Sequence, residues 1–255
     1  MKKQTKPFKF YKKIVAFFYG KVKFHGLENI PEEPSLIIGN HAQAHGTFMA
    51  ELYFPGRKGI WCIGTMMDKK LIPEYAKEDW WKYKKKKSMW FYNFIARLLA
   101  PLVAYVHNRA KTIAVWHDAR AINTFKNTVK VLKEGCNVII FPEHHVPYND
   151  IVNEFQDKFI DVARLYYKNT GKCLSFVPMY TAPMLRSVYL GKPIKYDPAI
   201  EIEAQRDIIR TYLVNEITAI AKSLPPHKVV PYANVSKKDY PMSRPETPEE
   251  AAAKK

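Results

Sequence analysis

Cysteine is scarce in this chain, and its few cysteines stand apart from one another. Cys62, Cys136 and Cys173 each lie singly within an apolar stretch. Single, unpaired thiols suit a reducing compartment such as the cytoplasm rather than a fold stabilised by disulfides. Their expected role is core packing.

Long uninterrupted hydrophobic runs are also lacking. The nearest candidate, residues 89–106, is interrupted by Asn93, Arg97 and Pro101, so the sequence predicts no membrane-spanning helix. Lysines break up the first residues, and no small-residue cleavage site follows the short apolar run 14–19. We therefore expect no secretory signal peptide.

Acidic residues are few: 24 Asp and Glu stand against 41 Lys and Arg, which gives a net charge of +17. Such a charge implies an anionic partner, either a membrane surface or nucleic acid. Residues 1–24 combine lysines with aromatic residues and contain no acid, and residues 14–22 read as an amphipathic helix. Residues 80–92 repeat this basic, aromatic composition. No nucleic-acid-binding signature accompanies the charge. We expect a peripheral protein on the inner face of the cell membrane, with a solvated basic face as the alternative.

Apolar residues make up 47% of the chain, which is enough for one sizeable core. Strand-like runs occupy residues 36–39, 60–64, 102–107, 138–141, 174–180 and 188–194. Helical periodicity marks residues 122–132, 155–166 and 209–224. This alternation predicts an α/β fold, with a mixed sheet flanked by helices. The domain is expected to span residues 25–236, followed by a disordered tail over residues 237–255.

Two strand-like runs end in titratable side chains. Residues 36–39 lead to Asn40 and His41, and residues 138–141 lead to Glu143, His144 and His145. An imidazole at a strand exit is a common way to present a general base at a cleft. Two such strand ends predict one converging site.

Four short blocks then occur in a characteristic order. They are Asn40-His41, Tyr105-Val106-His107-Asn108-Arg109, Phe141-Pro142-Glu143, and Val177-Pro178. With these blocks, residues 20–200 resemble the glycerolipid acyltransferase family, which contains the bacterial 1-acyl-glycerol-3-phosphate acyltransferases. The resemblance implies a glycerol-3-phosphate acyltransferase-like fold with an amphipathic N-terminal helix. It also implies transfer of a fatty acyl chain from acyl-CoA, acyl carrier protein or acyl phosphate to a lysophospholipid or glycerophosphate-type acceptor, without a metal or redox cofactor.

The resemblance assigns roles to several of these residues. His41 would take the proton of the acceptor hydroxyl, and Glu143 would hold that hydroxyl. Arg109 would bind the acceptor phosphate, because a guanidinium pairs bidentately with phosphate oxygens. The remaining substrate-binding candidates are Asn40, His144, His145 and Pro178.

The chain departs from the family at one critical position. The family has an acid that would fall at position 46, where this chain has Gly46. Such an acid fixes the tautomer of the histidine and stabilises the imidazolium. The alternative groups to hold the ring are Glu51, His45, Asp118 and a backbone carbonyl, and the sequence leaves the choice among them open.

The missing acid motivates a second hypothesis, a lipid-binding relative with weakened catalysis. A third hypothesis is a metal-dependent hydrolase. His41 and His45 are four residues apart, which would place both rings on one face of a helix, and this hypothesis requires Glu143, His144 and His145 to converge with them. The stretch lacks the internal glutamate of zinc-protease helices, so we favour the acyltransferase.

Overall fold

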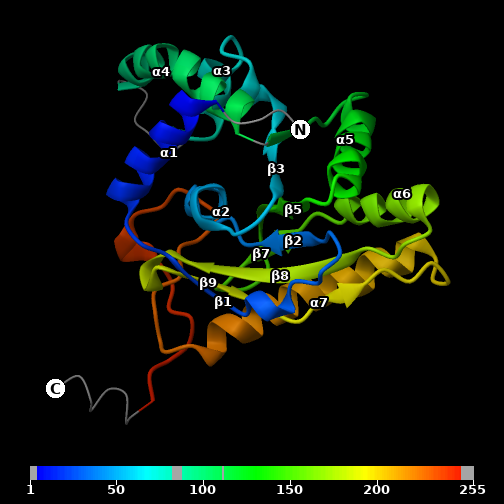
Figure 1. Cartoon of the computed structure of the whole chain (residues 1–255). Coiled ribbons are helices and arrows are strands. Elements are labelled where there is room, and N and C mark those ends of the chain that lie inside the picture. The colour runs from blue at the N-terminus through cyan, green and yellow to red at the C-terminus, as the bar shows by residue number, and fades with distance from the viewer. Residues whose placement is uncertain (1–4, 82–87, 111, 248–255) are drawn as a thin grey trace.

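A computed structural model describes residues 5–81, 88–110 and 112–247 (Figure 1). The strands are β1 (Lys23–His25), β2 (Leu36–Gly39), β3 (Lys58–Ile63), β4 (Thr112–Val115), β5 (Asn137–Ile140), β6 (Glu143–Pro147), β7 (Asn153–Phe155), β8 (Ser175–Ala182), β9 (Ser187–Leu190) and β10 (Ile194–Lys195). The α-helices are α1 (Lys6–Tyr19), α2 (His45–Tyr53), α3 (Ile72–Glu78), α4 (Met89–Arg109), α5 (Ala121–Lys133), α6 (Asp161–Thr170) and α7 (Ile202–Ser223). Short 3-10 helices are η1 (Leu27–Asn29), η2 (Gly64–Met67), η4 (Lys158–Ile160), η5 (Pro183–Leu185) and η6 (Lys237–Asp239).

The main sheet has the order β1-β9-β8-β2-β5-β3-β4, and β10 pairs with β8. Strands β8, β2, β5, β3 and β4 run parallel to their neighbours in this part of the sheet. The pairs β8–β9 and β8–β10 are antiparallel, so the sheet is mixed. Strands β6 and β7 form a separate antiparallel hairpin. The predicted class, a mixed α/β sheet flanked by helices with an amphipathic helix at the N-terminus, is confirmed.

Strand β2 lies at the centre of the sheet, and its apolar side chains are fully buried on both faces. Leu36 and Ile38 belong to the core that α5, α6 and α7 cover, whereas Ile37 packs on the opposite face with α2. Figure 1 shows α2 above the sheet and α7 below it. A strand covered on both faces needs a continuous apolar run rather than alternation, which is why this segment was recognisable in the sequence.

Helices α3 and α4 pack together at one end of the molecule (Figure 1). Ala96, Ala100 and Ala104 recur every fourth residue on the buried side of α4, and Ala100 and Ala104 cluster with Ile72 of α3. Small residues at this spacing let two helices approach closely. The prediction of a strand at residues 102–107 is therefore wrong, because these residues form the end of α4.

The outer side of α4 is apolar and exposed. Trp90, Phe94, Leu98 and Leu102 follow one another at intervals of four residues, and the side chain of Leu98 is 67% exposed. By length and composition, α4 is apolar enough to cross a bilayer, and only 17% of its most apolar window is buried. The sequence analysis expected no helix of this kind, because Asn93, Arg97 and Pro101 interrupt the apolar run. The mean hydropathy of the run stays high in spite of these interruptions.

Helix α1 shows a similar exposed apolar surface. Phe8 is buried against the domain, whereas Phe17 and Phe18 are each 81% exposed. The helix begins earlier than predicted, at Lys6 beside Pro7, and ends at Tyr19, before Gly20, whose φ is 85°. The basic residues 82–87 of the second predicted patch lie outside the described residues.

Two further expectations differ from the structure. The helix predicted to begin at Phe155 begins instead at Asp161, since Phe155 belongs to β7. The tail expected to be disordered packs on the domain in its first part. Tyr240 is 8% exposed, and the Val229 N–H donates to the Pro241 carbonyl at 2.8 Å. Residues 248–255 lie outside the described part.

Candidate active site

The carboxyl ends of β2 and β5 lie side by side, because these strands are parallel neighbours with Ile38 paired to Ile140. Ligands of open α/β sheets bind at this edge. The next residues on each chain segment bring His41 and Glu143 together. The backbone N–H of His41 donates to Oε2 of Glu143, and the backbone N–H of Asn153 donates to Oε1 at 2.9 Å.

Glu143 thus ties the His41 loop to the β6–β7 hairpin. Its residue surface is 5% exposed, and burial raises its carboxyl pKa to about 7, although the two N–H groups that it accepts act in the opposite direction. Both oxygens are engaged by the protein. The predicted role of Glu143 in holding an acceptor hydroxyl stays a prediction.

The ring of His41 is held by a backbone carbonyl. Its Nδ1 contacts the carbonyl oxygen of Gln43, and a carbonyl oxygen only accepts hydrogen bonds. The neutral ring therefore carries its proton on Nδ1, which leaves the lone pair of Nε2 available. Within the residues described, no hydrogen bond reaches Nε2. Burial lowers the pKa of His41, partly offset by the Gln43 carbonyl and by the charge of Asp79, so the ring is neutral at pH 7.

A cavity of about 970 Å³ opens beside this ring. Most of its wall is apolar and comes from β3, α4, α5 and the strand ends around Phe141. The volume is at the upper end of the range, roughly 300–1,000 Å³, typical of small-molecule sites. An apolar chamber of this size beside an available imidazole nitrogen suits a long aliphatic substrate.

Aromatic rings surround the imidazole. The His41 ring meets Phe141 edge-on at a centroid distance of 5.7 Å and Tyr232 at 5.5 Å. Tyr232 also contacts the His145 ring at 5.4 Å, so it lies against both histidines. His145 lines the cavity, and its predicted role in substrate binding stays a prediction.

Gly46 lies in the first turn of α2, directly against the His41 loop. A Cβ atom at this position would lie 2.7 Å from the carbonyl oxygen of His41 and 2.8 Å from that of Asn40. The Gly46 N–H also donates to the His41 carbonyl at 3.0 Å. The close approach of helix and loop explains the glycine, and this loop conformation leaves no room for a carboxylate there.

Two of the groups considered as supports for His41 have other partners. Nδ1 of His45 hydrogen-bonds the Tyr19 hydroxyl at 2.7 Å, and Glu51 forms an ion pair with Lys12 at 2.7 Å. Both contacts attach α1 to α2. Asp118 pairs with Arg120 at 2.6 Å on the surface. The backbone carbonyl is the alternative that the structure realises.

Three other predicted residues, Asn40, Pro178 and His144, contact neighbouring strands rather than the cavity. Asn40 donates from Nδ2 to the Thr181 carbonyl at 3.1 Å and accepts the Thr181 N–H at 2.6 Å, so it fixes the exit of β2 to β8. Pro178 is a buried residue of β8 that pairs with Ile38. His144 lies 3.5 Å from the carboxylate of Glu154 across the β6–β7 hairpin. Asn40, Pro178 and His144 are absent from the described wall of the cavity.

Arg109 is not brought to the site. It lies in the last turn of α4, over the ring of Tyr105 at 5.7 Å, and it is absent from the described cavity wall. Its assignment to a strand end was wrong, because the apolar stretch before it is helical.

Several residues of the site were missed by the sequence. Asp79 lines the cavity and accepts a hydrogen bond from the Tyr75 hydroxyl at 2.7 Å. Among the described lining residues, Lys158 is the one lysine or arginine. Tyr232 and Gln43 complete the surroundings of His41. None belongs to a recognisable motif, and only the four-residue spacing of Tyr75 and Asp79 gave a local signal.

The hydrolase hypothesis required a cluster of metal ligands. His41 precedes α2 and His45 begins it, so the two rings do not share a helix face. In the described ranges, no three His, Cys, Asp or Glu side chains gather as metal ligands. That hypothesis is not supported by the geometry.

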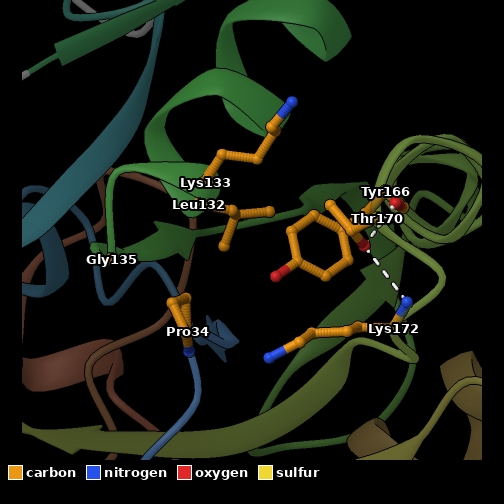
Figure 2. A pocket seen from close by; sticks show the side chains of 7 residues that line it. All are labelled: Pro34, Leu132, Lys133, Gly135, Tyr166, Thr170 and Lys172. Carbon is orange, nitrogen blue, oxygen red and sulfur yellow. Dashed lines mark hydrogen bonds between the residues drawn. The ribbon is translucent and has the colours of Figure 1, made fainter.

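A second hollow of about 330 Å³ lies near the end of α5 (Figure 2). Figure 2 shows Tyr166 and Lys172 facing it, and Lys172 pairs with Glu33 at 2.9 Å. No residue of the His41 cavity lines this hollow, so the candidate site is the larger cavity.

No model of a known protein family matches the sequence, and no curated protein matches it. Among solved structures, the chain is similar to the 1-acyl-sn-glycerophosphate (LPA) acyltransferase PlsC from Thermotoga maritima. The sequence identity is 14%, the TM-score is 0.46, and the match covers 84% of this chain and 78% of that one. At this identity and TM-score, the likeness assigns no activity to the chain.

Proposed function

We propose that the chain is a membrane-associated acyltransferase that uses His41 as its general base. It would transfer a fatty acyl group from an acyl thioester or acyl phosphate to the hydroxyl of a lysophospholipid or glycerophosphate-type acceptor. The observation that carries this proposal is the state of His41: a neutral ring oriented through Nδ1, with Nε2 available at the wall of a large apolar cavity.

The reaction follows from that arrangement. Nε2 of His41 takes the proton of the acceptor hydroxyl while the hydroxyl oxygen attacks the acyl carbonyl. The tetrahedral intermediate then collapses to an ester and expels the thiolate or phosphate, which takes up a proton from the imidazolium. Asp79 favours the protonated ring electrostatically, so it would stabilise the imidazolium without touching it.

Lys158 is the cation that we assign to the acceptor headgroup. Its side chain is exposed and borders the same cavity as His41. An ammonium group binds phosphate as a point charge, and Arg109 does not reach this wall.

Membrane attachment would follow from α1 and α4. Both helices expose large apolar side chains, and both border the cavity, through Tyr11 of α1 and Leu99 and Leu102 of α4. A substrate could therefore pass between the lipid surface and the cavity. We propose a peripheral association with the anionic inner face of the cell membrane.

The direct test is acyl transfer by purified protein. Labelled acyl-CoA, acyl carrier protein thioester and acyl phosphate are each offered with a panel of lysophospholipids and glycerol 3-phosphate. His41→Ala should abolish transfer, and His25→Ala should not, because His25 of β1 stacks on Tyr189 of β9, outside the cavity. Equal transfer by the folded His41→Ala variant would remove His41 from the mechanism.

A catalytically weakened lipid-binding protein is the second candidate. It is favoured by one observation: within the described residues, no carboxylate hydrogen-bonds the His41 ring. Disabling the corresponding acid of a serine protease lowers the rate by about 10⁴. Stoichiometric binding of a lysolipid without transfer from any donor would support this candidate.

A further inference from the structure

We infer that a C-terminal strap, residues 227–243, replaces the missing acid by holding the Gln43 carbonyl against His41. This inference rests on the proposed role of His41 as a base. Gln43 is a positioning residue in this view, since it acts through the imidazole. The strap lies outside residues 20–200, which carry the four motif blocks.

The Gln43 backbone needs an external support. Ala42 and Gln43 have φ values of 47° and 55°, so two successive non-glycine residues adopt the left-handed conformation. Such residues are energetically unfavourable and persist only where the surroundings determine them. Their conformation turns the Gln43 carbonyl back toward the ring two residues earlier.

The strap supplies that support through Gln43 itself. The Gln43 N–H donates to the Pro231 carbonyl at 3.0 Å. Its side-chain Nε2 donates to the carbonyls of Ala233 at 3.2 Å and Val235 at 3.4 Å, and its Oε1 accepts from the Tyr240 hydroxyl at 3.4 Å. Every polar group of Gln43 except the carbonyl is therefore bonded to the strap.

Packing fixes the neighbouring residue in the same way. Ala42 is 1% exposed and forms a small buried cluster with Val230 and Tyr240 of the strap. Tyr232, from the same segment, lies edge-on against the His41 ring. The strap thus contacts the backbone and side chain of Gln43, the side chain of Ala42 and the ring of His41.

The strap is itself attached to the sheet. The His227 ring hydrogen-bonds the Tyr180 hydroxyl of β8 at 2.7 Å, and Lys228 and Met242 form an antiparallel bridge. The Ser243 N–H donates to the His227 carbonyl at 2.9 Å. A segment that is anchored to the sheet at its base can hold the loop in one conformation, as an acid on a rigid element would.

The test compares the tautomer of His41 with its activity in the full-length protein. Gln43→Met keeps the size of the side chain and the backbone carbonyl but removes three hydrogen bonds to the strap. Tyr240→Phe removes one. Lys228→Ala is the matched control, because it removes a strap hydrogen bond, from Nζ to the Lys237 carbonyl at 3.2 Å, that does not involve Gln43.

Nitrogen-15 NMR of the histidine rings, assigned with His41→Ala, should show a protonated Nδ1 in the wild type and in Lys228→Ala. Gln43→Met should give a mixture of tautomers and a fall in kcat of about tenfold, with KM changed by less than about twofold. Tyr240→Phe should give a smaller shift in the same direction, and it decides the matter if Gln43→Met does not fold. Unchanged tautomer and kcat in the folded variants would overturn the inference. An inactive wild type with the expected tautomers would instead overturn only the proposed function.

Discussion

Placing the family's acid at position 46 should damage this protein rather than improve it. In Gly46→Asp the new Cβ would lie 2.7 Å from the His41 carbonyl oxygen and 2.8 Å from Cε1 of Phe141. Optimal contacts between such atoms are roughly 3.5 Å or longer, so α2 or the loop must move. Overpacking of this kind costs about 1–3 kcal/mol.

The carboxylate adds a second cost. The nearest polar atoms are the carbonyl oxygens of His41 and Asn40, which cannot donate hydrogen bonds to it. Partial desolvation without a donor costs about 1–3 kcal/mol more. The free energy of unfolding should therefore fall by about 2–6 kcal/mol in Gly46→Asp and by about half as much in Gly46→Ala.

Thermal unfolding and acyl transfer measure the consequences. For a chain of this size each kcal/mol lowers Tm by about 2–4 °C, so Gly46→Ala should lose about 5 °C and Gly46→Asp about twice that. Transfer should fall in both variants, since the displaced loop carries His41. A Gly46→Asp protein that melts like the wild type and transfers acyl groups faster would refute the reasoning, because the loop would then accept an acid as support for His41.

Three further outcomes are expected. Lys158→Ala should raise KM for phosphate-bearing acceptors about tenfold and leave kcat nearly unchanged, as expected for one lost charge-assisted contact; equal KM values would exclude Lys158 from headgroup binding. The double change Phe17→Ser and Phe18→Ser should weaken co-sedimentation with anionic vesicles, whereas Ile208→Ser on α7 should not, and an unaltered bound fraction would argue against the α1 contact. Burial raises the pKa of Glu143 to about 7, so the folded protein binds more protons at this group than the unfolded chain between about pH 4.5 and 7. The stabilising contribution that Glu143 makes at low pH is therefore lost as the pH rises through this window, by about 3 kcal/mol. Urea unfolding at pH 5 and pH 7.5 should show that the wild type loses stability relative to Glu143→Gln across this window.

The central strands could be predicted from the sequence because their apolar runs are continuous. Residues 36–39 and 138–140 are buried on both faces. Each run is too short for a helix and is bounded by turn residues, which favours a strand. The convergence of His41 and Glu143 followed from the same reading. Parallel neighbours bring their carboxyl ends to one edge, whatever joins them.

Helix α4 could not be read correctly from the same signals. Its last residues are rich in branched and aromatic side chains, which favour strands locally. Ala100 and Ala104 decide the matter through packing on Ile72 of α3, and this is a tertiary effect. The error also removed Arg109 from the site, because its predicted position depended on the strand.

The support of His41 was beyond sequence reasoning for a different reason. Gln43 meets Ala233, Val235 and Tyr240 across about 190 residues of chain. A backbone carbonyl leaves no trace in residue type, so the sequence left it as one alternative among several. Asp79 and Lys158 were missed because a single charged residue outside a motif has no signature.

The contacts between α1 and α2 make the exposed helix a poor candidate for removal. A chain shortened to begin after Tyr19 would lose the phenol that pairs with His45 and the lysine that pairs with Glu51. It would also lose the carbonyl of Ala16, to which the Tyr53 hydroxyl donates at 2.9 Å. Removing the apolar N-terminal helix to improve solubility would therefore weaken the attachment of α2, which directly follows His41. Purification of the full chain in detergent or lipid nanodiscs should keep the site intact.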